Sequence, residues 1–579
     1  EGTSPWQLAL MHDQSPMLAW YLEFFPLDML AVGDSLHCAV REQSPQAVGL
    51  LLAAGASPHT GRGETGQTPL QIAAALGNVA IVEQLLEAGA EMEDRDDAGG
   101  SALLFAAANG HGRVVHRLLE AGDEREAHDW RGSGIVHLSV ASGNAALVEM
   151  LVGNDLPGSS RQNANANANA NAPKQQNQPC HWLFADSSGR TPFHYAAVAG
   201  VPESLQVLLT ASEERGSRQG ASSLASFLAL PCDPHASTAL HLAAASSAPS
   251  AAAVLRLLML AAPSTLLLRD SDGNMPLHVA CMHGQMKSVV ALLEGLEEGR
   301  HASHPSLSWP PSLCHEVLTS RTVQWQSPLH LCAMASAPSG RAASPHSTEK
   351  ETEKETETKT ETKTETEDFQ AQRSANLLAC MLHWCQKLLT PSDLSQLLKL
   401  QDRQGTTPLN AACHSGSMQA VDAILTCLRA EEIEAMVHVA DRQGFSPLHQ
   451  AALAGSPALC TQLLKVGAQP FATSRGRTTI CMAACQGGHL PTVQLFFPFL
   501  NSGNTSSSSS AAAALPQLQL PPHLTAKDAG GRDCLHYAAK AGHAAVVQWL
   551  LETWNWPLIQ NVDGEGQTPL HHAAMAGQA

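Results

Sequence analysis

Aromatic residues are scarce in this sequence. They make up 4% of its 579 residues, whereas hydrophobic residues as a whole make up 44%. A core of that size must therefore be built mainly from Ala, Leu and Val. This composition indicates short helices that pack closely through small side chains, rather than a β-sandwich.

Long uninterrupted apolar runs and an excess of basic residues are also missing. The most apolar stretch, residues 251–268, is interrupted by Arg256 and Pro263, so we expect no membrane insertion. The formal net charge of −19 argues against nucleic acid as the main partner. The fourteen cysteines have no regular paired spacing, which indicates small buried residues in a reducing compartment and predicts a cytoplasmic chain.

What the sequence contains instead is one phrase that recurs along most of its length. From Thr68 to Ser101 to Gly134 the step is 33 residues each time. Such a fixed period indicates a repeat architecture. The clear copies are GQTPLQIAAALG (66–77), GRTPFHYAAVAG (189–200), GNMPLHVACMHG (273–284), GTTPLNAACHSG (405–416), GFSPLHQAALAG (444–455), GRDCLHYAAKAG (531–542) and GQTPLHHAAMAG (566–577), and weaker copies bring the total to about fourteen.

Each position of the phrase has a physical role. In the last copy, Thr568 can cap a helix with its hydroxyl, and Pro569 follows where a missing N–H carries no penalty. Gly577 suits the left-handed residue that ends a helix. The segments between copies carry Asp and Gly in positions typical of a tight turn. These turn sequences are DRQG (402–405 and 441–444), DSDG (270–273) and DAGG (528–531).

A second apolar helix follows most copies. In VAIVEQLLEAGA (79–90) the apolar residues lie at i, i+1, i+4 and i+5, which gives one buried face at helical period. Neighbouring helix pairs would then bury one continuous Ala/Leu seam. We therefore expect Leu70, Leu277 and Leu448 to be buried.

These copies resemble the ankyrin repeat, whose T-P-L-H-x-A signature and 33-residue period they share. The resemblance covers nearly all of the chain apart from its inserts. It implies a mainly all-α fold, an α-solenoid of helix-turn-helix units with β-turn or hairpin loops. The last copy lacks a second helix, so we expect the chain to be a fragment of a longer protein.

Low-complexity segments divide the predicted repeats into blocks. Segments 161–179, 347–368 and 501–522 cannot bury enough apolar surface to offset their ordering entropy, so we expect them to be disordered. Whether the repeats form one solenoid or several blocks stays open. The predicted organisation is 1–152 repeats (about five, the first degenerate), 153–185 Asn/Ala-rich linker, 186–336 repeats with inserts near 211–232 and 296–320, 337–370 Glu/Thr/Lys insert, 371–500 repeats, 501–527 Ser/Ala/Pro-rich linker and 528–579 repeats, the last truncated.

Histidine is abundant, at 28 residues, but its placement favours a structural role. In the ankyrin-repeat family, the histidine of T-P-L-H, the fourth position of the phrase counted from its Thr, hydrogen-bonds near the helix start and ties adjacent loops together. The pairs His571–His572 and Cys180–His181 lack the spaced partners of a zinc site, so we expect no metal. The histidines in this position are His37, His137, His194, His241, His278, His330, His449, His536 and His571.

No pattern in the sequence predicts catalysis or a cofactor. The segment GRGETG (61–66) matches a dinucleotide fingerprint, but it spans a loop rather than following a strand in a βαβ unit. Cys281, Cys332 and Cys534 occupy small or helix-start positions of the phrase, not the position of a nucleophile beside a base. We therefore expect no enzyme within this chain.

The remaining candidate is a protein-binding surface at the loop tips and the exposed end of the first helix. In members of the ankyrin-repeat family, these positions line the concave face that binds other proteins. Trp130 and Phe445 are large side chains at positions expected to face solvent, as binding hot spots often are. The full predicted set is Trp130, Arg131, Ser271, Asp272, Asn274, Arg403, Gln404, Thr406, Arg442, Gln443, Phe445, Arg475, Arg477, Arg532 and, on a first helix, Lys540.

Charge differs between the early and the late loops. The loops of 403–532 carry repeated Arg, whereas the early loops carry Glu64, Asp96 and Asp97. One hypothesis is that the C-terminal half receives an acidic segment of a partner protein. The alternative is that these charges only keep the surface soluble.

The sequence therefore predicts a non-catalytic scaffold or adaptor that binds other proteins. The alternative is that these repeats recruit substrates or partners for a larger multidomain enzyme or ion channel. The functional domain of that protein would then lie outside residues 1–579. A nuclear location is also possible, and a membrane-associated one would require flanking regions that span the bilayer.

Overall fold

The structure is a computed structural model of the chain. It describes residues 16–17, 19–20, 32–59, 66–124, 127–153, 184–219, 224–232, 234–301, 309, 311–335, 376–496, 526–554 and 560–577. Within these residues the secondary structure is helical, apart from isolated β-bridges such as His128–Gly134 and Thr473–Thr479 at loop bases. The predicted all-α class is confirmed for this part of the chain. Its helices fall into two compact units, residues 1–271 and 272–579.

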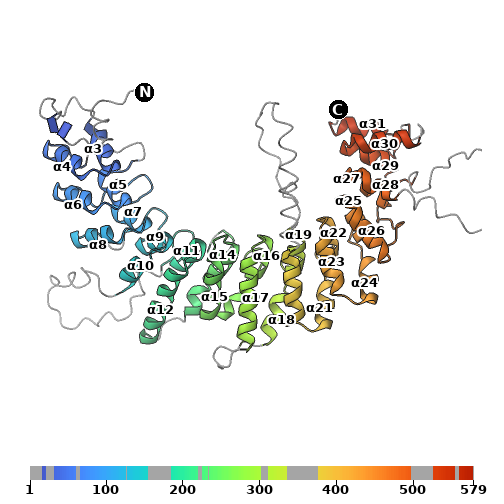
Figure 1. Ribbon diagram of the computed structural model, residues 1–579, viewed down its shortest axis with the longest axis horizontal. Coiled ribbons are helices and arrows are strands. Elements are labelled where there is room, and N and C mark those ends of the chain that lie inside the picture. The colour runs from blue at the N-terminus through green and yellow to red at the C-terminus, as the bar shows by residue number, and fades with distance from the viewer. Residues whose placement is uncertain are drawn as a thin grey trace, which may run out of the picture. The chain divides into compact units, whose positions relative to one another are not determined.

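The first unit consists of stacked helix pairs (Figure 1). Each first helix packs against the first helix of the next pair, and each second helix packs against its own first helix. The first helices are α3 (Val32–Arg41), α5 (Pro69–Leu76), α7 (Ala102–Ala108), α9 (Ile135–Ser142), α11 (Pro192–Ala199) and α14 (Ala239–Ala245). The others are α4 (Pro45–Ala53), α6 (Val79–Glu87), α8 (Gly112–Ala121), α10 (Ala145–Val152), α12 (Pro202–Gln219), α13 (Leu224–Leu228), α15 (Ala251–Ala261) and η3 (Pro263–Leu267).

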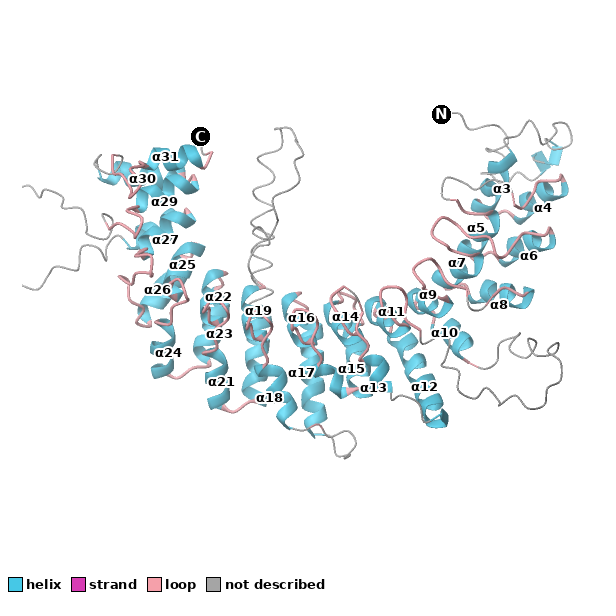
Figure 2. Cartoon of the chain, turned by 180° about the vertical axis from the view of Figure 1, so that it is seen from behind, coloured by secondary structure: helices cyan, strands magenta, loops and turns pink. Residues whose placement is uncertain are grey.

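The second unit follows the same plan, with the loops between pairs drawn in pink in Figure 2. Its first helices stack in chain order. They are α16 (Pro276–Met282), α19 (Pro328–Met334), α22 (Pro408–His414), α25 (Pro447–Ala454), α27 (Ile480–Gly487), α29 (Cys534–Ala541) and α31 (Pro569–Met575). The others are α17 (Met286–His301), α18 (Pro311–Thr319), α21 (Pro391–Leu398), α23 (Met418–Thr426), α24 (Ala430–Val437), α26 (Pro457–Lys465), α28 (Leu490–Phe496) and α30 (Ala544–Trp554).

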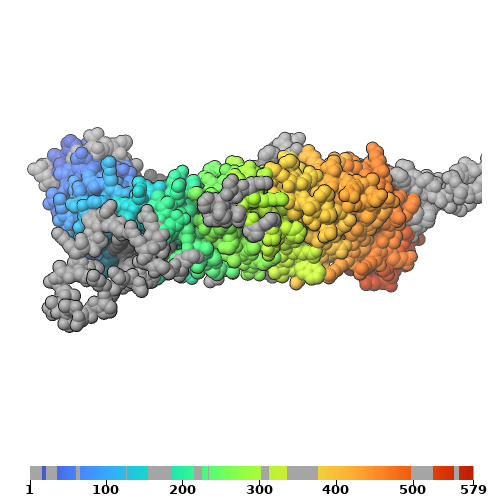
Figure 3. Space-filling model, turned by 90° about the horizontal axis from the view of Figure 1, so that it is seen from below, coloured from blue at the N-terminus to red at the C-terminus, as the bar shows by residue number. Residues whose placement is uncertain are grey.

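A seam of Leu and Ala side chains runs through each unit, and the space-filling view shows neighbouring repeats in contact along both (Figure 3). Leu70, Leu277 and Leu448 are each 1% exposed, which confirms their predicted burial. Burying one such leucine contributes about 1.5–3 kcal/mol. The alanines beside them, Ala73 and Ala74 in α5, are fully buried and leave room for the next helix.

The predicted side-chain cap forms at some helix starts and not at others. At α29 it forms beside a histidine, because Oδ1 of Asp533 accepts the N–H groups of Leu535 and His536. The hydroxyl of Thr68 accepts from the N–H of Gln71, as an N-cap should. The same prediction for Thr568 is wrong, because its hydroxyl hydrogen-bonds Nδ1 of His571 at 2.7 Å and makes no backbone cap. Nδ1 of His571 in turn accepts a hydrogen bond from the backbone N–H of Thr568.

The structural role of the histidines is confirmed, and in His330 the geometry also fixes the tautomer. In His330, Nδ1 accepts from the N–H of Ser327 at 3.2 Å, so the ring proton is on Nε2. That Nε2–H donates to the carbonyl of Thr406 in the next loop at 2.9 Å. The side-chain amide of Gln71 makes the equivalent two hydrogen bonds. Its oxygen accepts from the N–H of Thr68, and its nitrogen donates to the carbonyl of Gly100.

Two predicted inserts form helix, and the low-complexity ones lie outside the described residues. The insert near 211–232 extends α12 to 18 residues and adds α13, and the insert near 296–320 extends α17 to 16 residues and adds α18. The segments 161–179, 347–368 and 501–522 are not described. Residues 376–388 are also helical, and they follow α19 beyond the 347–368 segment, where a second helix of the α19 pair would come.

Contacts with the neighbouring second helices support this pairing across the 347–368 segment. Lys387 donates to Glu297 of α17 at 2.6 Å, and the guanidinium of Arg300 donates to the carbonyl of Leu388. On the other side, Gln386 contacts Cys427 next to α23. The helix at 376–388 thus lies between α17 and α23, where the second helix of its pair belongs. Among the helices of the described ranges, none is long and apolar enough to cross a bilayer.

Candidate protein-binding surface

The loop tips share one turn design built on an aspartate and a glycine. In the loop before α22, Oδ1 of Asp402 accepts the N–H groups of Gln404 at 2.9 Å and Thr406 at 2.8 Å. Gly405 has φ +81°, a left-handed conformation that glycine adopts without strain. The predicted Asp–Gly turns are confirmed here and at Gly444 and Gly531.

Backbone hydrogen bonds join each loop tip of the second unit to the next one. The N–H of Arg403 donates to the carbonyl of Gln324, that of Arg442 to Gln404, and that of Arg475 to Gln443, all at 2.8–2.9 Å. Because this ladder fixes the distance between successive loops, the three arginines leave the backbone at equivalent points. They form a row of exposed cations, and Gln404 and Gln443 between them are exposed as well.

Two further predicted residues of this region have structural constraints. Thr406 is half-buried, because its carbonyl accepts from His330 and its N–H binds Asp402. Arg477 is exposed and left-handed, with φ +60°, in the turn position that elsewhere holds glycine. Such a conformation is unusual for a side-chain-bearing residue and occurs more often at functional sites.

In the first unit the predicted surface residues lie on two loops, Trp130 and Arg131 on one and Ser271 on the other. Trp130 is 74% exposed, and its indole covers the Cα of Gly99, where any side chain would collide with it. Arg131 beside it is exposed, and its carbonyl accepts from the N–H of Ser187 at 2.7 Å. Ser271 is exposed and donates its N–H to the carbonyl of His235.

The remaining predicted residues differ in exposure. Asp272 and Lys540 are exposed, and Lys540 lies on the first helix α29 as expected. Asn274 was expected at an exposed loop tip, but it is 8% exposed. Phe445 is half-buried, because its ring packs edge-on against His449, 5.6 Å away. The guanidinium of Arg532 is bound to Asp528 at 2.8–2.9 Å.

The early loops expose fewer acidic side chains than the sequence indicates. Asp96 is 9% exposed, because its Oδ1 accepts the N–H groups of Ala98 and Gly100 in the same turn design. Asp97 is exposed, and Glu64 lies outside the described residues. The turn aspartates therefore accept hydrogen bonds from backbone N–H groups of their own loops. By contrast, the side chains of Arg403, Arg442 and Arg475 are exposed to solvent.

The titratable groups of the core are held in unreactive states. Burial lowers the pKa of His194 and of His449 to about 4, against opposing hydrogen bonds to Leu230 and Thr478 respectively, so both stay neutral. Burial raises the pKa of the Cys385 and Cys460 thiols to about 12. A thiol becomes a nucleophile when its pKa is lowered, so these cysteines are structural.

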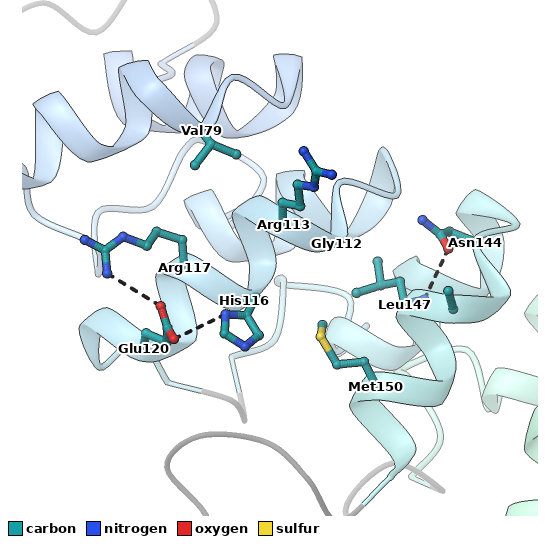
Figure 4. Close-up of a pocket in the computed structure, with 10 residues that line it drawn as sticks. Val79, Gly112, Arg113, His116, Arg117, Glu120, Asn144, Leu147 and Met150 are labelled. Carbon is teal, nitrogen blue, oxygen red and sulfur yellow. Dashed lines mark hydrogen bonds and ion pairs between the residues drawn. The ribbon is translucent and has the colours of Figure 1, made fainter.

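A hollow of about 450 Å³ lies on the second helices of the first unit, away from the loop tips (Figure 4). Leu147 and Met150 extend into it from α10, and Arg117 and His116 line it from α8. Arg117 is already paired with Glu83 at 3.0 Å and with Glu120 at 3.5 Å. The hollow therefore has an apolar floor, and its rim carries both the paired Arg117 and the exposed Arg113.

One trio of side chains could offer ligand atoms to a metal. His59, Glu91 and Asp94 each have such an atom, all within 4.8 Å of one another. The first two are exposed, and exposed groups of this kind are common without a metal. No second feature of the described chain marks this trio as a site.

A second hollow, of about 280 Å³, lies among the loop tips of the second unit and was not found from sequence. Its lining includes Arg321, Trp325, Lys399 and the predicted Arg442. Trp325 occupies the turn position of Gly405 and Gly444. Aligning TVQWQSPLH (322–330) with DRQGTTPLN (402–410) would have identified this replacement.

Comparisons with known proteins agree with this geometry. The family described as ankyrin repeats (3 copies) matches residues 36–129, 103–219, 377–474 and 482–579, and the single ankyrin repeat matches residues 272–298. The chain is also similar to the NF-kappa-B inhibitor cactus of Drosophila melanogaster, with 32% identity over 182 residues. That alignment covers 30% of this chain and spans 36% of the length of the relative. The family matches extend over more than half of the sequence, and the chain belongs to the ankyrin-repeat family.

Proposed function

We propose that this chain is a non-catalytic scaffold or adaptor that binds partner proteins along its loop tips and first helices. The observation that carries the proposal is the ladder of loop tips that fixes Arg403, Arg442 and Arg475 in one exposed row. A rigid row of side chains can be matched by a partner without ordering flexible loops first, which favours affinity.

The family and the similar relative support a role in protein interaction rather than in catalysis. Repeat solenoids offer extended binding surfaces, and the relative is named as an inhibitor of NF-kappa-B. In the described part of this chain, the cysteines with strongly raised pKa values are buried and the histidines of the repeats bind backbone. These features favour a binding protein, and its free thiols favour a cytoplasmic location.

The charge of the arginine row indicates the class of partner. Three exposed guanidinium groups on successive loops favour an acidic protein segment, because opposite charges speed encounter and fix register. The whole chain carries a formal charge of −19, so this basic row also distinguishes one face from the rest.

The test is affinity capture from cell lysate followed by quantitative mass spectrometry, comparing the natural chain with an Arg403→Glu, Arg442→Glu, Arg475→Glu variant. A matched control places the same charge change on exposed cations outside the row, as Lys287→Glu, Arg429→Glu, Lys465→Glu. We expect partners to be lost from the first variant by at least about tenfold and kept by the control. Equal capture by both variants would reject the arginine row as the binding surface.

A further inference from the structure

The hollow on the second helices of the first unit is open because Gly112 has no side chain. Gly112 is the first residue of α8, and the corresponding residues of the neighbouring second helices are Val79 in α6 and Ala145 in α10. A Cβ at position 112 would meet only the side chain of Leu147, at 3.9 Å, which is an ordinary contact distance. The chain therefore leaves open a space that a side chain could fill without a collision.

The floor of this hollow is apolar. Leu147 and Met150 extend into it from α10, and Val79 of α6 also lines it (Figure 4). Leu147 is buried, whereas Met150 and Val79 are half-buried and keep part of their surface in contact with water. A partner that covers this apolar surface gains the free energy of its burial. The thioether of Met150 can adapt its shape to the side chain that it meets.

The two arginines at the rim differ in their partners. Arg117 binds both nearby carboxylates, since it pairs with Glu83 at 3.0 Å and with Glu120 at 3.5 Å. His116 contacts the same Glu120 at 3.4 Å. Arg113 is exposed, and among the described residues no carboxylate pairs with it. Arg113 is therefore available to an anionic group that enters beside the apolar floor.

The position of the hollow favours a helix of another protein as its occupant. Small-molecule sites surround most of their ligand, whereas this hollow lies between the outer sides of α8 and α10 and is open to solvent. An apolar groove between helices suits the apolar face of an amphipathic helix, whose large side chains recur at i, i+3 and i+4. Arg113 at the rim then adds a preference for an acidic residue beside that face.

We propose that this hollow binds the apolar face of an amphipathic helix of a partner protein, in which an acidic residue pairs with Arg113. A volume of about 450 Å³ accommodates more than one aliphatic side chain of that helix. These side chains lie on Leu147 and Met150, in the space that Gly112 leaves open. This surface lies away from the loop tips, so it is a second interaction surface and does not rest on the proposed function.

The experiment selects binders to the full chain from a phage library of eighteen-residue amphipathic helices that are randomised along one face. The recovered pools are sequenced for the natural chain, for Gly112→Leu, which fills the hollow, and for Ala544→Leu as a control. We expect one family of peptides to be depleted at least about tenfold by Gly112→Leu and kept by Ala544→Leu. Its members should share large aliphatic residues at i and i+3 or i+4, with an acidic residue beside them.

The two leucine variants are closely matched. Ala544 is the exposed first residue of α30, as Gly112 is the first residue of α8. The histidine before each helix hydrogen-bonds a carbonyl of an earlier first helix, His111 that of Ala75 and His543 that of Gln486. Gly112→Leu keeps the melting temperature within about 3 °C of the natural chain or above it, because leucine is favoured over glycine in a helix.

A charge exchange tests the role of Arg113. The most enriched peptide of that family is labelled with fluorescein, and its binding is measured by fluorescence anisotropy. Arg113→Glu weakens it about threefold to tenfold, and replacing the acidic residue of the peptide by lysine reverses most of that loss. Lys287→Glu makes the same change of sign at the corresponding second residue of α17 and leaves binding within about twofold of the natural chain.

Several outcomes would overturn this second surface. Equal pools on the natural chain and on Gly112→Leu would show that no helix binds in the hollow. Complete displacement of the peptide by decanoate at equal concentration would assign the hollow to a small amphiphile, and dimerisation that Gly112→Leu abolishes would assign it to a second copy of the chain. Lysate partners lost from the Arg403, Arg442 and Arg475 variant, without any peptide that depends on Gly112, would leave the proposed function intact while rejecting this surface.

Discussion

The hydroxyl of Tyr537 donates to Oδ2 of Asp528, nine residues earlier in the chain, at 2.9 Å. The same spacing joins Tyr195 to Asp186, His572 to Asp563 and Gln450 to Asp441. In each case the first helix holds the carboxylate of its own loop, while the other oxygen of that carboxylate accepts backbone N–H groups. The helix and the loop before it are thus connected by one aspartate.

Removing this aspartate should destabilise the repeat more than removing its helix partner. Oδ1 of Asp528 accepts the N–H groups of Gly530 and Arg532, and its Oδ2 also binds the Arg532 guanidinium. Asp528→Ala leaves all of these donors without an acceptor, so we expect a loss of about 2–3 kcal/mol. Tyr537→Phe removes one hydrogen bond and should reduce stability by about 1 kcal/mol.

Urea unfolding followed by circular dichroism measures both changes. Lys540→Ala, at an exposed position of the same helix, serves as the control and should stay within about 0.5 kcal/mol of the natural chain. A larger loss for Tyr537→Phe than for Asp528→Ala would contradict the central role of the carboxylate.

A side chain at Gly531 should disturb the ladder between loop tips. Gly531 has φ +78°, and a Cβ there would meet the backbone N of Gly564 at 2.6 Å, the atom whose N–H donates to the carbonyl of Gly530. Gly467→Ala is the matched control, because Gly467 is also left-handed, φ +106°, but a Cβ there meets nothing within 4 Å.

We expect Gly467→Ala to lose about 1–2 kcal/mol from backbone conformation alone. Gly531→Ala should lose clearly more, since the clash with the next loop adds to the same conformational penalty. Thermal unfolding of the two variants and hydrogen exchange of the Gly564 amide provide the comparison. Equal losses would mean that the ladder adjusts without energetic consequence.

Buried His449 predicts a loss of stability in weak acid. Burial lowers the pKa of His449 from 6.5 to about 4, so the unfolded chain binds a proton more readily than the folded one. The contribution of neutral His449 is therefore present above pH 6.5 and is lost as the pH falls through 4. The pKa difference corresponds to at most about 3 kcal/mol for this residue.

His449→Gln should remove this pH dependence and keep the fold, because Gln71 makes the equivalent hydrogen bonds in α5. The measurement is the free energy of unfolding between pH 4 and pH 7 for both chains. Its slope should be smaller in the variant over the interval from 6.5 to 4. An unchanged slope would show that His449 does not carry the effect.

The first helices could be predicted from sequence because their signals are local. The capping residue, the leucine, the alanine pair and the closing Gly all lie within ten residues of one another, as from Thr68 to Gly77 around α5 and from Ser446 to Gly455 around α25. The connection of His330 to Thr406 also followed, since the family places one loop beside the next. The role of Thr568 did not, because its hydroxyl has two nearby partners and the imidazole of His571 is the stronger competitor.

The loop-tip hollow could not be predicted in the same way. Arg321 and Lys399 are separated by the 347–368 segment, and only the stacking of α19 on α22 brings their loops together. The left-handed φ of Trp325 likewise depends on the turn around it, in which Thr322 replaces the usual aspartate. Asp96 was mistaken for a surface charge because its backbone partners cannot be read from composition.

The cysteines provide a last prediction about the core. Cys385 and Cys460 are fully buried, and burial raises the pKa of both thiols to about 12, so very little thiolate forms near neutral pH. Cys38 is half-buried at the end of the first unit. Pulsed alkylation at pH 8, read by peptide mass spectrometry, should therefore modify Cys38 before Cys385 and Cys460. Cys385 and Cys460 should react at least about a hundredfold more slowly than in urea, because modification must wait for the repeat to open. Rapid labelling of Cys460 in the folded chain would mean that the seam between α26 and its neighbours is open to solvent, and the close packing on which the arginine row depends would then be absent.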